Sequence, residues 1–215
     1  MCEPFADGIV PRSEDVAFFG VHPFSAEADD ALSRVDDLGA RLAAAPRAFV
    51  GEIGLDRLLT REVSPRMREV FERQLRLASQ YHRPVALHGA KCWGQVVQTI
   101  ERTVEPGAIP AYLFHGFSRS DGLLPQIVAM GGYISVGPSV LNDHAVNYRQ
   151  LVKAIPLDRL LVETDRTSET AAKAPRIEEV VCSLAGCRGF TAEALAFRLE
   201  RNADAFIACV CERRH

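Results

Sequence analysis

Four residues of types that bind metal ions each follow a short apolar stretch of the sequence. They are Glu52, His88, His115 and Asp165. The stretches before them are short and evenly apolar, which indicates buried parallel strands. Active sites of parallel α/β folds lie where the carboxyl ends of the strands meet. Carboxylate and imidazole groups gathered at such an edge, without thiolates, suit zinc, manganese, magnesium or iron.

The four residues are more informative together than singly. A lone histidine after an apolar strand, such as His88 or His115, is more often a hydrogen-bonded core residue than a metal ligand. Burying two acids and two histidines on separate strands with nothing to pair them would cost several kcal/mol each. A cation among them is the simpler explanation, and the sequence therefore predicts a metal site.

Other polar residues near these positions have structural as well as functional interpretations. Glu163 lies two residues before Asp165, so it points the same way along the strand, and we expect it to pair with a neighbouring strand. Asp56 either caps the turn after its strand or orients a metal ligand. His22 ends its own strand and is expected at the rim of the site or behind the metal ligands.

Basic residues near the ligand positions could hold a phosphate group. Those nearest in sequence are Lys91, Arg57 and Arg166. Solvated surface charge is an equally good explanation for each of them.

The elements that must position these residues alternate between strands and helices. Strands are predicted at Val16–Val21, Ala48–Ile53, Pro84–Leu87, Ala111–Phe114, Gly132–Val136 and Leu160–Val162, with a weaker signal at Asp7–Val10. Helices are predicted at 26–45, from Ser64-Pro65 to Ala78, at 93–104, from near Ser120 to Gly131, at 147–154, at 176–184 and from Ala192 to about Cys211. This alternation gives a parallel sheet that is either doubly wound or closed into a barrel.

The composition is that of a soluble globular protein in one domain, residues 1–215. Hydrophobic residues make up 47% and charged residues 25% of the chain, and the formal net charge is -3. The chain therefore has no net positive charge to attract long nucleic acids. The absence of a signal peptide or a long apolar run predicts a cytoplasmic protein without a membrane partner. The six cysteines are expected to remain thiols.

Six ordered motifs resemble the TatD family of metal-dependent hydrolases. They are Gly51-Glu52-Ile53-Gly54-Leu55-Asp56, Phe71 to Ala78 with Gln74-Leu75, Pro84-Val85-Ala86-Leu87-His88, His115-Gly116-Phe117-Ser118, Gly132-Tyr133-Ile134-Ser135-Val136-Gly137 and Ile155 to Asp165. The resemblance extends from about Gly20 to Arg201-Asn202 and Phe206. A set of motifs in a fixed order is far more specific than any one of them.

The resemblance implies a TIM-barrel-like (β/α) barrel with one or two divalent metal ions, used for phosphodiester hydrolysis as in a deoxyribonuclease. Glu52 would bridge two metals, and His88 and His115 would bind one of them. Asp165 would bind metal and accept a proton from the attacking water, so Glu52 and Asp165 are the predicted catalytic residues. His22, Lys91 and Arg166 are the predicted substrate contacts.

The sequence also departs from the family pattern. The family begins with a strand ending in His-x-His, and no such motif precedes His22. One hypothesis places the true start upstream of Met1, and the other holds that the strand was lost, so we expect a barrel incomplete or distorted at its first strand. Such a barrel has unpaired strand edges that a partner chain could cover. Arg166-Thr167 and Gly89-Ala90 also differ from common family residues.

We therefore expect a hydrolase that cleaves phosphodiesters, with DNA ends or short single strands as candidate substrates. Two alternatives stay open. One is hydrolysis of a C–N or C–O bond in a small molecule on the same fold. The other is an inactive binding or structural protein, because the His-x-His ligands are missing.

Overall fold

A six-stranded parallel sheet forms the centre of the protein. The computed structural model describes residues 16–58, 61–166, 170 and 173–210. The strands are β1 (Phe18–Phe19), β2 (Phe49–Asp56), β3 (Val85–Ala90), β4 (Tyr112–Phe114), β5 (Gly132–Val136) and β6 (Leu160–Val162). All six predicted strands are present, and Asp7–Val10 lies outside the described residues.

Seven α-helices and four short 3-10 turns connect and cover the strands within this part of the chain. The helices are α1 (Ala31–Ala44), α2 (Pro65–Gln80), α3 (Trp93–Thr103), α4 (Leu124–Ala129), α5 (Val146–Ala154), α6 (Ile177–Arg188) and α7 (Ala192–Ala208). The 3-10 turns are η1 (Pro23–Ser25), η2 (Asp121–Leu123), η3 (Pro138–Leu141) and η4 (Leu157–Arg159). Every predicted helix is found, with shifted ends.

Two helices begin later than the sequence predicts. α1 starts at Ala31 rather than near Ala26, because the polar run before it contains aspartates, which favour turns and caps over helix interiors. The predicted helix near Ser120 is divided into η2 and α4. Pro125 lies in the first turn of α4, where its missing N–H costs nothing.

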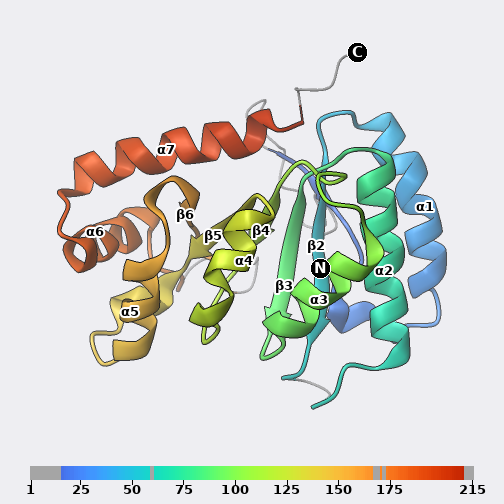
Figure 1. Ribbon diagram of the computed structural model, residues 1–215, viewed down its shortest axis with the longest axis horizontal. Helices are drawn as coiled ribbons and strands as arrows, with labels where there is room; N and C mark the ends of the chain where they lie inside the picture. Colours follow the sequence, from blue (N-terminus) through green and yellow to red (C-terminus); the bar gives the residue numbers. More distant parts are fainter. Residues whose placement is uncertain (1–15, 59–60, 167–169, 171–172, 211–215) are drawn as a thin grey trace.

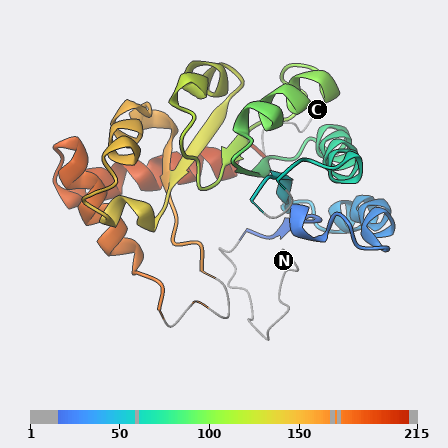
Figure 2. The ribbon, with the colours of Figure 1, turned by 90° about the horizontal axis from the view of Figure 1, so that it is seen from below.

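The order of the strands decides between the two predicted architectures. Each strand pairs with the next one along the chain, in the order β1-β2-β3-β4-β5-β6. A doubly wound sheet would reverse its order at a switch point. The sheet curves, and α1 to α5 follow one another along its convex side (Figures 1 and 2). This winding in a single direction is that of a (β/α) barrel.

Glu52 and His88 lie inside strands that are longer than the sequence predicts, since the predicted strands end at Ile53 and Leu87. β2 continues to Asp56 and β3 to Ala90. The register of β2 against β3 shifts between Val50 and Ile53, so β2 carries an extra residue beside Glu52. Bulges of this kind re-aim side chains and are common near active sites.

Beyond the bulge, β2 and β3 approach each other at a glycine. Gly54 pairs with His88 and has a φ of 147°, a value that side-chain-bearing residues avoid. A Cβ atom at Gly54 would lie 2.0 Å from the His88 carbonyl oxygen. This close approach places the segments carrying Glu52 and His88 next to each other.

Two apolar clusters hold the sheet in place. The larger lies between the sheet and its helices and includes Val50, Leu87, Phe114 and Ile134. The smaller joins Phe49 and Tyr133 to Phe206 of α7. Figure 1 shows α7 crossing the end of the sheet opposite to the arrowheads of β2 and β3. The site-bearing edge is therefore left uncovered by α7.

Buried Asn202 fastens α7 to the loop before β6. Its amide nitrogen donates to the carbonyl oxygens of Leu157 and Leu160, at 2.7 and 2.8 Å. Asn202 belongs to the family-like motif near the end of the chain, and its role here is to hold the last helix.

The helices and cysteines of the described residues bear on the membrane and disulfide predictions. No single helix there has both the length and the apolar character to cross a membrane, whereas α6 and α7, bent by 108°, pass that test only as a pair, by length and composition. The described cysteines, Cys92, Cys182, Cys187 and Cys209, are free thiols as predicted. Cys2 and Cys211 lie outside the described residues.

Candidate metal centre

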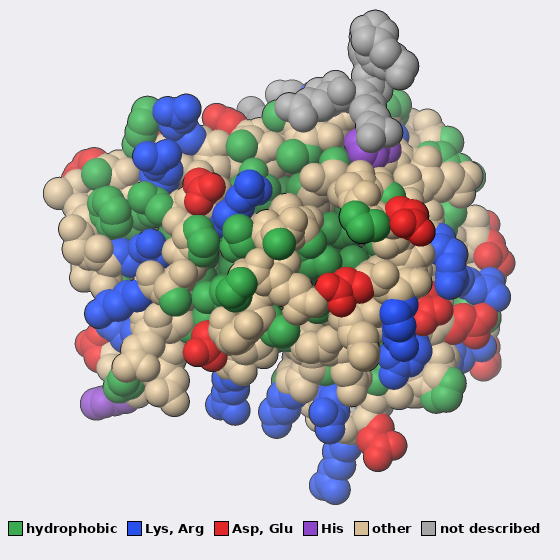
Figure 3. Space-filling view, in the orientation of Figure 1, with side chains coloured by type: hydrophobic (Ala, Val, Ile, Leu, Met, Phe, Trp, Pro, Cys, Tyr) green, Lys and Arg blue, Asp and Glu red, His purple; other side chains and the backbone are tan. Residues whose placement is uncertain are grey.

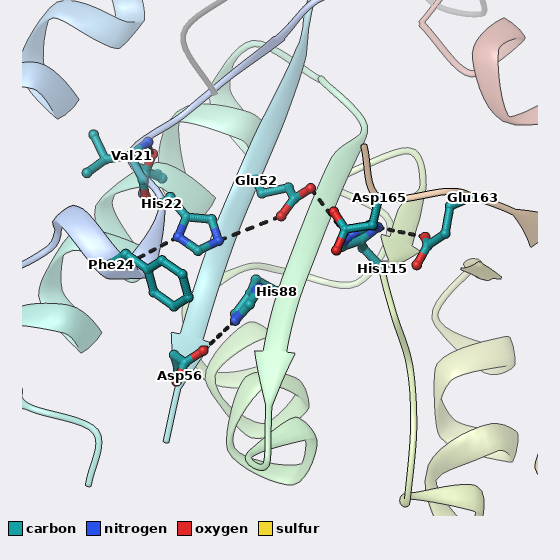
Figure 4. A network of polar contacts seen from close by, with 10 residues as sticks. Val21, His22, Phe24, Glu52, Asp56, His88, His115, Glu163 and Asp165 are labelled. Carbon is teal, nitrogen blue, oxygen red and sulfur yellow. Dashed lines mark hydrogen bonds and ion pairs between the residues drawn. The ribbon is translucent and has the colours of Figure 1, made fainter. Parts of the chain in front are cut away.

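A cavity of about 1250 Å³ opens at the carboxyl ends of the strands. Its walls include Glu52 from β2, His88 from β3 and His115 from the residue after β4. Asp165 contributes from the segment that follows β6. Figure 4 shows these side chains turned toward one another from four different segments. The fold therefore brings all four predicted metal ligands to one place.

Glu52 is the shared member of two groups that could each hold a metal ion. One group is His22, Glu52 and His88, and the other is Glu52, His115 and Asp165. The candidate ligand atoms within each group lie within 4.8 Å of one another. His88 and His115 belong to different groups, so the two histidines are not placed around one common ion. Glu52 is the residue that links the two groups.

His115 is surrounded by three carboxylates. Its Nδ1 lies 2.6 Å from Glu163 Oε2, and its Nε2 lies 3.4 Å from Asp165 Oδ1 and 3.6 Å from Glu52 Oε1. Burial alone would lower the pKa of His115, but the bonds to Asp165 and Glu163 and the attraction of the nearby acids raise this pKa to about 11. The bond to His115 in turn lowers the pKa of Asp165, against its partial burial.

Glu163 fixes which nitrogen of His115 faces the cavity. Ser135 Oγ on the neighbouring strand β5 donates to Glu163 Oε2, which confirms the pairing predicted for this acid. With its raised pKa, His115 carries a proton on each nitrogen at neutral pH, and it must lose one of them to bind a metal ion. A carboxylate accepts hydrogen bonds only, so the proton that remains is the one on Nδ1 beside Glu163. The lone pair is then on Nε2, on the side of Glu52 and Asp165.

Asp56 fixes His88 in a similar way but at the other nitrogen. This fully buried acid accepts from the Leu58 N–H at 2.6 Å, and its Oδ2 lies 2.7 Å from His88 Nε2. Asp56 thus both caps the turn and orients a histidine, and the two predicted roles are both present. The proton of His88 is held at Nε2, which leaves the lone pair at Nδ1.

His22 is buried in the cavity wall, so of the two positions predicted for it the rim is excluded. Its side chain is 8% exposed, and its Nε2 lies 3.7 Å from Glu52 Oε2. Burial and the neighbouring His88 lower the pKa of His22 to about 3, so the ring is neutral at physiological pH.

The donor atoms of the cavity fit a divalent metal cation. Imidazole nitrogens and carboxylate oxygens converge there, and three acids crowd His115. Cys92 also lines the cavity, but burial and the nearby Asp56 raise the pKa of its thiol to about 12. The geometry therefore favours a nitrogen and oxygen site without a thiolate ligand.

Basic side chains surround the opening of the cavity. Lys91, Arg57 and Arg166, the three predicted phosphate contacts, all line it. Arg119 lines it as well and was missed, although its place four residues after His115 was a usable signal. Figure 3 shows Lys and Arg side chains projecting along the lower edge of the molecule, where β2 and β3 end in Figure 1.

A curved parallel sheet wound in one direction, with histidines and carboxylates clustered at its carboxyl edge, defines the class of barrel-type metal-dependent hydrolases. Residues 10–208 match the family model described as TatD related DNase. The chain belongs to this family, and the family resemblance of its motifs is confirmed.

Similar proteins support the family and the fold. The crystal structure of YjjV, a TatD homologue from Escherichia coli K12, matches with a TM-score of 0.75 and 28% identity, covering 89% of this chain and 76% of that one. A TatD family hydrolase from Entamoeba histolytica, 18% identical, has the same fold with a TM-score of 0.72, over 89% of this chain and 74% of that one. The predicted TIM-barrel-like fold is thus confirmed.

Two curated relatives carry functional names. An uncharacterized metal-dependent hydrolase from Haemophilus influenzae is 37% identical over 54% of this chain and 45% of its own length. A protein from Pantoea vagans named 3'-5' ssDNA/RNA exonuclease TatD is 27% identical over 86% of this chain and 74% of its own length. The match to the first relative spans about half of that protein.

Proposed function

We propose that this chain hydrolyses phosphodiester bonds with one or two divalent metal ions held by Glu52, His88, His115 and Asp165. The observation that supports this most is the pair of ligand groups sharing Glu52 inside a cavity rimmed by basic side chains. The name of the Pantoea relative points to the same kind of bond. Ends of single-stranded DNA are the substrates we propose to test first.

The side chains of the site would have different roles in such a hydrolysis. A bound divalent ion would supply a Lewis acid that activates water and neutralises charge on the phosphate. Asp165 is the most exposed of the acids at 68%, and its lowered pKa keeps it ionised at neutral pH, so its carboxylate oxygen is available to accept a proton from the attacking water. Glu163 and Asp56 hold the rings of His115 and His88 in the orientation needed for ligation.

The basic rim favours an anionic substrate over a neutral one. Lys91, Arg57, Arg119 and Arg166 lie around the cavity, while the whole chain has a net charge of -3. The positive side chains thus concentrate where the phosphate would bind. An arginine can engage two phosphate oxygens at once.

The test compares substrates and variants in the presence of Mn²⁺, Mg²⁺ or Zn²⁺. We expect hydrolysis of bis(p-nitrophenyl) phosphate and of a single-stranded oligonucleotide, but not of an amide or a lactone. Glu52→Gln and His115→Asn should lower kcat/KM by about 100-fold or more, since a metal supplies several kcal/mol of transition-state stabilisation. The same ions should raise the Tm of the parent protein but not that of Glu52→Gln.

The matched control is His144→Ala, which removes an exposed histidine outside the cavity. This variant should retain the metal-dependent Tm shift and the activity. Turnover of the amide or lactone alone would support the small-molecule hydrolase instead. A protein that neither binds these ions nor turns over any of the substrates would be a binding or structural relative.

A further inference from the structure

We infer that His22 serves this site as a hydrogen-bond donor from Nε2 to an oxygen atom of the substrate, and not as a metal ligand. The identity of the acceptor rests on the proposed hydrolase function. The position of the proton on His22 rests only on the local structure around the ring.

Distance alone would make His22 a metal ligand. Its ring lies in the group with Glu52 and His88 whose candidate ligand atoms are within 4.8 Å of one another. A nitrogen can bind a metal ion only through a lone pair, however, and a neutral imidazole has a lone pair on just one of its two nitrogens. The neighbour of the other nitrogen therefore decides the role.

The turn after β1 places the lone pair of His22 on the nitrogen away from the cavity centre. His22 is the N-cap of η1, and Pro23 has no N–H to offer. The first amide of the turn is that of Phe24, and its N–H donates to His22 Nδ1 at 3.2 Å. Since Nδ1 accepts this bond, the proton of the neutral ring lies on Nε2, and Nε2 has no lone pair for a metal ion.

The surroundings prevent the ring from turning over. The His22 ring packs edge-on against Phe24 at 4.4 Å and against His88 at 4.7 Å between centroids. A turned ring would offer carbon instead of Nδ1 to the Phe24 N–H and leave this donor without its acceptor.

The backbone before His22 is held as firmly as its ring. Val21 N donates to Gln74 Oε1 at 2.6 Å, and Gln74 Nε2 donates back to the Val21 oxygen at 3.1 Å. The Gln74 side chain is fully buried on α2. The segment that carries His22 is thus anchored to α2 through Gln74.

The proton on Nε2 faces the cavity beside Glu52. The distance from Nε2 to Glu52 Oε2 is 3.7 Å, which is longer than a hydrogen bond. A substrate oxygen that binds next to Glu52 can accept from Nε2 in its place. A fixed donor of this kind gains strength as negative charge develops on that oxygen in the transition state.

Replacing His22 by asparagine tests the roles of the two ring nitrogens separately. In His22→Asn the side-chain oxygen can still accept from the Phe24 N–H, because asparagine is a good N-cap, but the group at Nε2 is gone. We expect an unchanged Tm and a Kd for Mn²⁺ within about twofold of the parent value. In contrast, kcat should fall about 100-fold with little change in KM. A rise of tenfold or more in the Kd for Mn²⁺, measured by calorimetry, would show a metal ligand and overturn the inference.

Nitrogen NMR tests the proton directly and does not depend on activity. In protein labelled with ¹⁵N-histidine, the His22 signals are assigned by their loss in His22→Asn. We expect a protonated Nε2 and an unprotonated Nδ1, both before and after addition of Zn²⁺. An unprotonated Nε2, or loss of its proton when Zn²⁺ is added, would contradict the donor role.

The two measurements distinguish failure of this inference from failure of the proposed function. If the parent protein binds no Zn²⁺, the hydrolase proposal fails, and the spectrum of the metal-free protein still decides the proton position. If the parent binds metal and is active while His22→Asn retains full kcat, the donor role is wrong and the hydrolase proposal stands.

Discussion

Each histidine of the cavity has one ring nitrogen held by a neighbour behind the site. The Phe24 amide holds His22, Asp56 holds His88, and Glu163 holds His115. Because these contacts decide where each proton lies, they decide which nitrogen is left for chemistry. The nitrogen left with a lone pair in the singly protonated ring is Nδ1 in His88 but Nε2 in His115.

Changing Asp56 to asparagine should weaken metal binding without removing any ligand. The asparagine oxygen can still accept from the Leu58 N–H, but the asparagine NH₂ group then faces His88 Nε2. Nε2 can accept a hydrogen bond from this NH₂ group only after it loses its own proton. The proton moves to Nδ1, where it competes with the metal ion. We expect the Kd for Mn²⁺ to rise about 10- to 100-fold in calorimetry.

The control for this change is Asp158→Asn, which alters an aspartate that is 71% exposed and far from the cavity. It should bind Mn²⁺ as the parent does. An unchanged Kd in Asp56→Asn would mean that His88 does not need this partner for ligation.

At the scale of helices and strands, a helix cap could be predicted from neighbouring residues, but the register between two strands could not. Ser64 caps α2 by accepting from Met67 N, as the Ser64-Pro65 pair predicts. The bulge of β2 beside Glu52 depends on how β2 meets β3, two segments that are separated by the whole of α2. No property of the β2 sequence alone fixes that register.

The attachment of α7 gives a prediction at the same scale. Asn202→Ala removes the donor for the Leu157 and Leu160 carbonyl oxygens, and leaving a buried polar group unsatisfied costs about 1–3 kcal/mol. We expect the free energy of unfolding, measured in urea, to fall by about 2 kcal/mol or more. Asn147→Ala, at an exposed position of α5, should change it by less than about 0.5 kcal/mol.

For the whole molecule, the general position of the site was predictable and its internal arrangement was not. Alternating strands and helices were enough to place Glu52, His88, His115 and Asp165 at one edge. The division into two groups around Glu52 depends on side-chain directions across four segments. Spacing within one strand says which residues share a face, but it does not say how side chains from four separate segments meet.

Stability at alkaline pH is also a property of the whole molecule. Burial raises the pKa of Tyr148 to about 12 and raises that of Tyr112 further. Above pH about 10 the unfolded chain loses these protons before the folded protein does, so the unfolded state is favoured as pH rises. We expect the urea midpoint to fall steadily between pH 10 and about 12.

A tyrosine variant identifies the source of that decline. Tyr148→Phe should show a shallower fall than the parent, because one of the two tyrosines with a raised pKa is gone. Tyr81→Phe, which alters a partly buried ring against the main cluster, is the matched control. Equal slopes in the parent and Tyr148→Phe would assign the decline to other groups.

Trp93 is the single tryptophan of the chain, and it lies in the wall of the cavity proposed to hold the metal. Its indole packs against the backbone of Gly89, the residue after His88, and against Phe114 and Phe117 at ring distances of 5.4 and 5.3 Å. Indole fluorescence therefore reports on one place only, beside the proposed metal ligand His88. Emission quenched by an ion with unpaired electrons, such as Co²⁺, would report occupancy of the centre without any added dye.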